Sequence, residues 1–278
     1  MALRLINGAE FLHIPKTGGN WVRSVLRNND LDRGEIGLHK HSNYNLTKLS
    51  GELIERKGAK VLFHDLISNY NGAIDVINKI GSIKSVLWQY LTEIFRNRTN
   101  NKRFRFCFVR NPFSWYESWW RYQEERGWPE WPNRDVCPWH PNEALNGLGS
   151  NNFNQFMYNV VNERPGYVTE MFYSYTKKNI SFVGKQENLR KDLQSVLNAM
   201  NVSYDTETIH KSSRRNVSER KSINWDKSIK KSILRLEVSS FINFGYISKS
   251  EIEEMGIDMN ISRHRSLHYP KSSSVSGT

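Results

Sequence analysis

Residues 11–21 read FLHIPKTGGNW, a short apolar run followed by a lysine, a threonine and two glycines. The apolar residues predict a strand over 10–14, and the periodicity after the glycines predicts a helix over 19–27. The first N–H groups of a helix have no intrahelical partner, so a glycine turn between a strand and a helix is suited to hold an anion. The stretch therefore predicts an α/β fold with an anion-binding turn at a strand end.

The residue order in this turn differs from that of a nucleoside-triphosphate loop. In the pattern G-x-x-x-x-G-K-[ST] the lysine follows the glycines, whereas Lys16 precedes Gly18 and Gly19. The glycines allow an anion to approach the backbone closely, and Lys16 adds a point charge. Taken alone, the motif is also compatible with a tight turn that carries a surface lysine.

A second candidate anion site follows the apolar run FRFCFV, which predicts a buried parallel strand over 104–109. Arg110 ends this strand. Ligands of such sheets bind beyond the carboxyl ends of the strands, so we expect the Arg110 guanidinium at the same edge as Lys16. A structural ion pair of Arg110 is the alternative.

The segment after Arg110 predicts a helix over 113–123. Asn111 and Pro112 suit the N-cap and the first helical position. Ser114 and Ser118 lie four residues apart and therefore share one face of this helix. An arginine at a strand end together with a serine early in the next helix suits a phosphate group.

The rest of the chain alternates strand-like and helix-like segments. Further strands are expected at 36–39, 60–64 and 181–184, and further helices at 45–56, 83–95, 153–162, 187–200 and 227–241. Residues 126–149 are rich in Trp, Pro and Asn and predict a long loop. The alternation predicts one three-layer α/β domain over 1–261, with a central, mostly parallel sheet flanked by helices. A basic, polar tail follows over 262–278.

The charge of the chain indicates an anionic partner. The 278 residues include 40 Lys and Arg against 28 Asp and Glu, a formal net charge of +12. Between residues 211 and 231, eight basic residues stand against two acidic ones, so this stretch holds half of the net charge. Such a surplus favours a nucleotide, a sulfated or phosphorylated ligand, nucleic acid or anionic lipid. A solvated helix face is the alternative interpretation of the stretch.

The two cysteines, Cys107 and Cys137, do not predict a disulfide or a metal site. Cys107 lies in the apolar run over 104–109, which predicts a buried free thiol, and no metal-ligand spacing occurs. The first residues lack the apolar region of a signal peptide, and no stretch of 18 apolar residues is present. The sequence thus predicts a cytoplasmic protein without a transmembrane segment.

HIPKTGGNW and FCFVRNPFSWYES together resemble the motifs of sulfotransferases that use 3′-phosphoadenosine 5′-phosphosulfate (PAPS). FVGKQENLRKDL and FGY at 244–246 resemble the carbohydrate and membrane-associated branch, of which this chain looks like a soluble, bacterial- or phage-like member. The resemblance implies a P-loop-like fold, a bound 5′-phosphosulfate at the first motif and a 3′-phosphate at the second. The run KSSRR at 211–215 falls where family members place a loop over the nucleotide. The implied donor-binding residues are Lys16, Thr17, Gly18, Gly19, Asn20, Trp21, Arg110, Ser118, Arg214 and Arg215.

The implied reaction is in-line transfer of a sulfuryl group to a hydroxyl or amine of a small-molecule or glycan acceptor, without a metal. Lys16 is the expected catalytic cation, because charge grows on the bridging oxygen as the bisphosphate leaves. His41 and His64 are the candidates for the general base, since histidine titrates near neutral pH. Other branches of the family use glutamate, so the choice between bases stays open.

Six of the nine tryptophans lie between residues 115 and 139. Trp115, Trp119 and Trp120 are expected in the core, whereas Trp128, Trp131 and Trp139 are candidates for a lid over the acceptor. Two other functions compete with sulfuryl transfer. A nucleotide kinase or ATPase would need a lysine after the glycines and an acidic magnesium ligand, and a non-catalytic polyanion or nucleic-acid binder would use the charge alone. No nucleic-acid motif is recognisable.

Overall fold

The computed structural model describes residues 2–36, 103–128, 140–176, 180–213 and 223–257. A five-stranded sheet forms its centre, in the order β3–β1–β2–β4–β5. Its strands are β1 (Ala2–Leu5), β2 (Glu10–Leu12), β3 (Asp32–Ile36), β4 (Arg105–Val109) and β5 (Phe182–Lys185). The predicted strands at 10–14, 104–109 and 181–184 correspond to β2, β4 and β5. Of the strand expected at 36–39, Ile36 is the last residue of β3, and residues 37–39 lie outside the described residues.

The sheet is mixed, which corrects the expectation of a mostly parallel sheet. β2, β4 and β5 pair in parallel, whereas β1 is antiparallel to both β2 and β3. Residues 6–9 connect β1 to β2, and the turn is closed by a hydrogen bond from the Leu5 N–H to the Ala9 carbonyl at 2.8 Å. A connection this short joins only antiparallel neighbours, because a parallel crossover needs a dozen or more residues.

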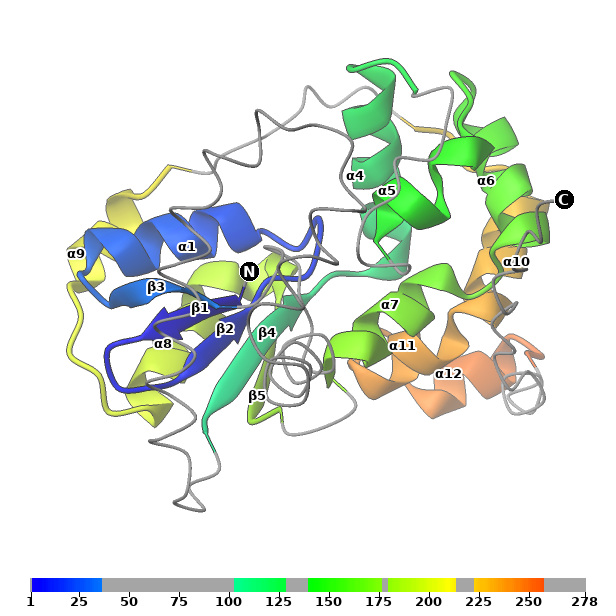
Figure 1. Cartoon of the computed structure of the whole chain (residues 1–278). Helices are drawn as coiled ribbons and strands as arrows, with labels where there is room; N and C mark the ends of the chain where they lie inside the picture. The colour runs from blue at the N-terminus through cyan, green and yellow to red at the C-terminus, as the bar shows by residue number, and fades with distance from the viewer. Residues whose placement is uncertain (1, 37–102, 129–139, 177–179, 214–222, 258–278) are drawn as a thin grey trace, which may run out of the picture.

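Helices lie on both faces of the sheet. Their bounds are α1 (Gly19–Asn28), α4 (Pro112–Glu124), α5 (Pro141–Ala144), α6 (Phe153–Glu163), α7 (Tyr167–Thr176), α8 (Leu189–Ala199), α9 (Thr206–Lys211), α10 (Lys227–Leu236), α11 (Val238–Asn243) and α12 (Lys249–Glu254). Two 3-10 turns are η1 (Asn146–Leu148) and η2 (Gln186–Asn188). Figure 1 shows α4–α7 and α10–α12 gathered in the right half of the view, while α1, α8 and α9 lie with the strands in the left half.

The alternation of side chains along β4 separates two cores. Phe106 and Phe108 pack with apolar residues of α1, α8 and α9. Cys107 and Val109 point to the opposite face and pack with α4, α6, α7 and α10. The predicted helices at 19–27, 113–123 and 153–162 are confirmed as α1, α4 and α6. Cys107 is a buried free thiol, as predicted, and burial raises the pKa of this thiol.

Three predicted segments differ from the structure. The helix expected at 187–200 begins as η2 and continues as α8, and the loop expected at 126–149 contains α5 and η1. The helix expected at 227–241 is divided into α10 and α11. The elements expected at 45–56, 60–64 and 83–95 lie outside the described residues, as does the tail.

Glu237 is the residue between α10 and α11. This fully buried carboxylate accepts hydrogen bonds from the Tyr116 hydroxyl at 2.6 Å and from the N–H groups of Val168 and Thr169 at 3.1 and 2.7 Å. Both N–H groups belong to the first turn of α7, where they have no partner within the helix. Burial raises the pKa of Glu237. Glu237, the only acidic residue between positions 227 and 243, thus caps a neighbouring helix.

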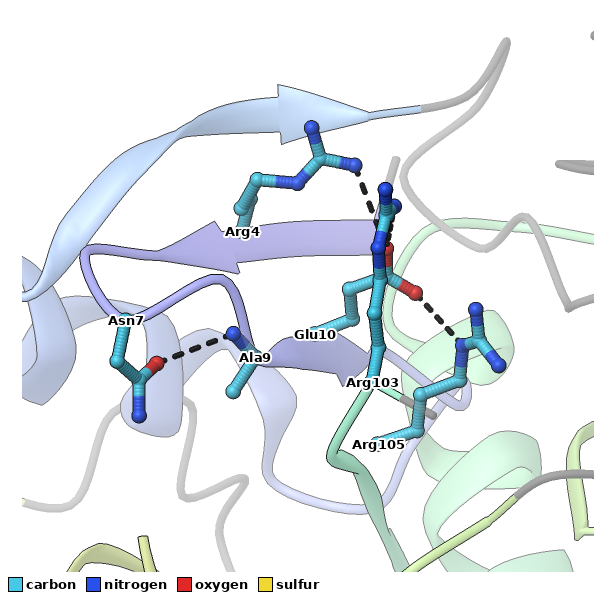
Figure 2. A network of polar contacts seen from close by, with 6 residues as sticks. All are labelled: Arg4, Asn7, Ala9, Glu10, Arg103 and Arg105. Carbon is cyan, nitrogen blue, oxygen red and sulfur yellow. Dashed lines mark hydrogen bonds and ion pairs between the residues drawn. The ribbon is translucent and has the colours of Figure 1, made fainter. Parts of the chain in front are cut away.

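A polar network lies at the amino end of β2 and β4, the end opposite to Lys16 and Arg110. The Glu10 carboxylate accepts hydrogen bonds from Arg4 at 3.3 Å, Arg103 at 2.9 Å and Arg105 at 2.7 Å (Figure 2). Strand register explains the arrangement, because Arg4 of β1 and Arg105 of β4 are the direct cross-strand neighbours of Glu10. Three guanidinium groups thus surround one buried carboxylate.

Candidate functional site

Two hydrogen bonds hold the turn between β2 and α1. The Thr17 hydroxyl donates a hydrogen bond to the Ile14 carbonyl at 2.9 Å, and the Trp115 indole N–H donates to the Pro15 carbonyl at 2.9 Å. Lys16 and Gly18 both have positive φ, 62° and 83°. Gly18 is the N-cap of α1. We call residues 15–20 the lysine–glycine turn.

Both glycines of the lysine–glycine turn are closely packed. A Cβ on Gly18 would lie 2.7 Å from Leu189 Cδ2, and a Cβ on Gly19 would lie 2.0 Å from His13 Cδ2. His13 is 4% exposed, so its ring has little room to move. The absence of side chains at these positions therefore lets α1 start directly against His13 and α8.

We expect Gly19→Ala to destabilise the turn by roughly 1–3 kcal/mol, the usual range for inserting a methyl group into a packed site. Thermal unfolding measures the change. Gly147→Ala is the matched control, because a Cβ at Gly147 meets nothing within 4 Å. A Gly19→Ala protein as stable as the Gly147→Ala protein would show that the His13 ring yields freely.

Arg110 joins the two sequence motifs. Its Nη1 donates a hydrogen bond to the Lys16 carbonyl at 3.3 Å, across 94 residues of sequence, and its Nε donates to Ser114 Oγ at 3.2 Å. Burial lowers the pKa of Arg110, and the carboxylates of Glu187 and Glu117 oppose that change. Arg110 thus lies between the lysine–glycine turn and the first turn of α4.

Ser118, predicted as the serine of this site, lies one turn beyond Ser114 on α4. The direct side-chain partner of Arg110 is Ser114. Ser114, Ser118 and Tyr122 recur every fourth residue and therefore share one face of α4. Arg110 contacts this face at Ser114, near the start of α4, and Lys16 contacts it at Tyr122, near the end of the helix.

The Lys16 ammonium lies over an aromatic ring. Its Nζ is 4.1 Å from the centroid of the Tyr122 ring, and the Arg126 guanidinium is 4.3 Å from the same centroid. Burial lowers the pKa of Lys16 to about 8, helped by the charges of Arg110 and Arg126 and opposed by Glu125. The predicted cation is therefore largely shielded from water, and it keeps its proton only up to about pH 8.

The start of α1 lies next to the end of α9. Asn20 is exposed, whereas Trp21 is buried and its indole N–H donates to the Ser212 carbonyl at 3.4 Å. Arg190 donates to the same carbonyl at 2.9 Å. Residues 214 and 215 follow two and three positions after Ser212. Arg214 and Arg215 lie outside the described residues, as do the candidate bases His41 and His64.

Two polar residues near Arg110 received no role from the sequence. Glu187 of η2 accepts hydrogen bonds from the Asn111 N–H at 2.8 Å and from the Tyr246 hydroxyl at 3.0 Å. They lie in the segments FVGKQENLRKDL and FGY, which resemble a family branch without implying a role for either side chain. The sequence thus contained both segments, but it did not indicate which residues their side chains contact.

The prediction for the tryptophans is confirmed in part. Trp115, Trp119 and Trp120 are buried in the core, as predicted. Trp128 is partly buried against the core, with its ring 5.1 Å from that of Phe156 and close to Gly149, and its place in an acceptor lid stays a prediction. Trp131 and Trp139 lie outside the described residues.

Two features are absent from the part of the chain that the structure describes. In these ranges no group of three or more His, Cys, Asp or Glu is arranged to hold a metal ion. Across the same part of the chain, no helix has the length and apolarity needed to cross a membrane.

Comparison with known proteins identifies the family. Residues 10–241 match the model of the sulfotransferase family, a span that contains the lysine–glycine turn, Arg110 and α4. No curated protein and no solved structure matches the chain. The family match covers most of the 278 residues, and the chain therefore belongs to the sulfotransferase family.

Proposed function

We propose that this protein transfers a sulfuryl group from PAPS to a hydroxyl or amine of an acceptor, with carbohydrates as the first acceptor class to test. One observation carries the proposal beyond the family match. The Arg110 guanidinium donates to the Lys16 carbonyl, which brings two anion-binding motifs together at one edge of the sheet. PAPS carries two anionic groups, a 5′-phosphosulfate and a 3′-phosphate, and so suits two adjacent cationic sites.

In this proposal the lysine–glycine turn acts as a P-loop-like cradle for the 5′-phosphosulfate. The N–H groups from Thr17 to Asn20 lie at the start of α1, where the first N–H groups of a helix and the helix dipole favour an anion. The Lys16 side chain supplies the adjacent positive charge. The close packing of Gly18 and Gly19 fixes the backbone, so the donors are oriented before the ligand binds.

Arg110 is the proposed ligand of the 3′-phosphate, with Ser118 and Ser114 on the adjoining face of α4. Ser114 already accepts from Arg110 Nε, so it orients the guanidinium. The remaining N–H groups of an arginine can address a phosphate in a planar, bidentate manner. Two fixed phosphate contacts then set the register of the donor relative to the acceptor.

The chemical step is an in-line displacement at sulfur. The acceptor oxygen or nitrogen forms a bond to sulfur while the bond between sulfur and the bridging phosphate oxygen breaks. The electron pair of that bond leaves with 3′,5′-ADP, and Lys16 neutralises the charge that grows on its oxygen. The acceptor proton passes to a base, for which we retain both His41 and His64 as candidates.

Arg214 and Arg215 are the proposed further contacts to the nucleotide. Support comes from their place in the sequence, two and three residues after Ser212. The Ser212 carbonyl is fixed by Trp21 at the start of α1 and by Arg190 of α8. The basic stretch that begins at Lys211 therefore leaves the described structure close to the lysine–glycine turn.

Isothermal titration calorimetry tests the proposal with the full chain. We expect 3′,5′-ADP to bind more tightly than ATP with Mg²⁺ or a single-stranded oligonucleotide, and to bind without added metal. Preference for ATP with Mg²⁺ would indicate a kinase or ATPase. Preference for the oligonucleotide would indicate a polyanion binder, and either preference overturns the proposal. A screen of sugar acceptors with labelled PAPS then identifies the acceptor.

A further inference from the structure

Two sequence segments have no role in the chemistry proposed above, namely QEN at 186–188 and FGY at 244–246. The structure joins them through Glu187. The Tyr246 hydroxyl donates to Glu187 Oε2 at 3.0 Å, across 59 residues of sequence. Glu187 Oε1 accepts from the backbone N–H of Asn111 at 2.8 Å. One carboxylate thus links the end of β5 and the turn after α11 to the residue that follows Arg110.

We infer that Glu187 and Tyr246 are positioning residues for Arg110 and thereby set the selectivity of the site for a ligand bearing a 3′-phosphate. The inference rests on the proposed function. Asn111 is the N-cap of α4, the point at which the chain leaves β4 and enters the helix. A hydrogen bond to the Asn111 N–H fixes the backbone at the base of the Arg110 side chain.

Tyr246 is itself fixed by the same strand end. Lys185, the last residue of β5, donates to the Gly245 carbonyl at 2.8 Å, and its Nζ lies 4.8 Å from the Tyr246 ring centroid. Gly245 has a φ of 63°, a left-handed conformation that favours glycine. The Tyr246 N–H donates to the Phe241 carbonyl at 2.8 Å. Strand β5 therefore places both Glu187 and its hydroxyl donor.

The charges around Arg110 also support a positioning role for Glu187 and Tyr246. Burial lowers the pKa of Arg110, and Glu187 is the foremost charge that opposes this change. Burial and the neighbouring Glu187 carboxylate raise the pKa of Tyr246, so its hydroxyl stays protonated and donates. Glu187 thus favours the charged form of Arg110, while Tyr246 and the Asn111 N–H occupy both oxygens of Glu187.

Two nucleotides that differ only in the 3′-phosphate test the inference, namely 3′,5′-ADP and 5′-AMP. We expect Glu187→Gln to raise the Kd of 3′,5′-ADP about tenfold, the lower end of the effect of losing a group that orients a ligand contact. Tyr246→Phe is expected to raise it by a smaller factor. The Kd of 5′-AMP is expected to stay unchanged in both variants, because this nucleotide does not engage Arg110 through a 3′-phosphate.

Matched controls remove equivalent hydrogen bonds elsewhere. Glu251 accepts one backbone N–H and one hydroxyl, both from Ser248, so Glu251→Gln copies the chemistry of Glu187→Gln. Tyr204 donates its hydroxyl to Asn198 at 3.0 Å, so Tyr204→Phe copies Tyr246→Phe. Both controls are expected to bind the two nucleotides as the wild type does.

A double-mutant cycle with Arg110→Met tests whether Glu187 acts through Arg110. If Glu187 acts through Arg110, Glu187→Gln adds no further loss of 3′,5′-ADP affinity in this background. Equal weakening of both nucleotides would indicate a purely structural role and overturn the inference, as would tighter binding of 3′,5′-ADP by Glu187→Gln. A wild type that does not prefer 3′,5′-ADP over 5′-AMP would instead refute the proposed function itself.

Discussion

Lys16→Met is expected to lower kcat for sulfuryl transfer by about 10²–10³-fold, the effect of removing one donor from a preorganised oxyanion site. Methionine keeps a long side chain but removes the charge. In the proposed reaction, the largest charge near Lys16 develops on the bridging oxygen only as the bond to sulfur breaks, so we expect the ammonium to stabilise the transition state more than the ground state. The Kd of 3′,5′-ADP is therefore expected to rise much less than kcat falls.

Single-turnover rates and calorimetry separate these two effects. A variant with normal kcat and a greatly raised Kd for 3′,5′-ADP would reassign Lys16 to binding alone. Lys16→Arg is the charge-retaining control, and we expect it to bind 3′,5′-ADP with wild-type affinity.

The pH dependence of kcat/KM gives an independent test of the role of Lys16. The pKa of Lys16 is lowered to about 8, so the cation is present below pH 8 and lost above it. We expect kcat/KM for the donor to fall above about pH 8 in the wild type, because this profile reports the free enzyme. In Lys16→Arg this alkaline limb disappears, since arginine keeps its proton over that range.

The sequence predicts the parts of the site that depend on local signals. A strand, a lysine and two glycines before a helix define the lysine–glycine turn without knowledge of any partner. Arg110 is predictable because an apolar run fixes the end of β4, and Asn111 with Pro112 fixes the start of α4. Side chains at carboxyl ends of parallel strands meet at one edge, which correctly places Arg110 against Lys16.

Features that depend on distant pairing were not predictable. Ser114 and Ser118 share one helix face, and only the rotamer of Arg110 selects Ser114 as its partner. Glu187 and Tyr246 lie 59 residues apart, with no local pattern that indicates their hydrogen bond. Glu237 lies between α10 and α11 and caps α7, an element that the sequence did not predict. β1 is four residues long and needs β2 and β3 on either side to be recognised.

Glu10→Ala is expected to reduce the free energy of unfolding by about 3–5 kcal/mol, the range for breaking a buried ion pair. The Glu10 side chain is 4% exposed and accepts hydrogen bonds from three arginines. Its removal leaves those guanidinium groups close together without their shared counter-charge. For a domain of this size the loss corresponds to a fall in Tm of roughly 10 °C, measured by thermal unfolding.

An exposed ion pair is the matched control. Lys211 and Glu207 approach to 2.6 Å, closer than any pair of Glu10, but their side chains are 74% and 68% exposed. Water screens such a pair, so Glu207→Ala is expected to leave Tm almost unchanged. Equal Tm values for the Glu10→Ala and Glu207→Ala proteins would mean that burial does not decide the strength of the Glu10 cluster.

The pH dependence of the Glu10→Ala effect follows from the charges on the three strands. Burial alone would raise the pKa of the Glu10 carboxyl, but the charges and hydrogen bonds of Arg105 and Arg103 outweigh burial and hold the pKa below its ordinary value of 4.5. A carboxyl with a lowered folded-state pKa stabilises the protein fully above pH 4.5, and this stability is lost as pH falls through the folded pKa. The difference in stability between wild type and Glu10→Ala should therefore stay constant from pH 7 to pH 5 and shrink below 4.5. A difference that grows on acidification would contradict a lowered pKa and would mean that Glu10 is protonated in the folded protein.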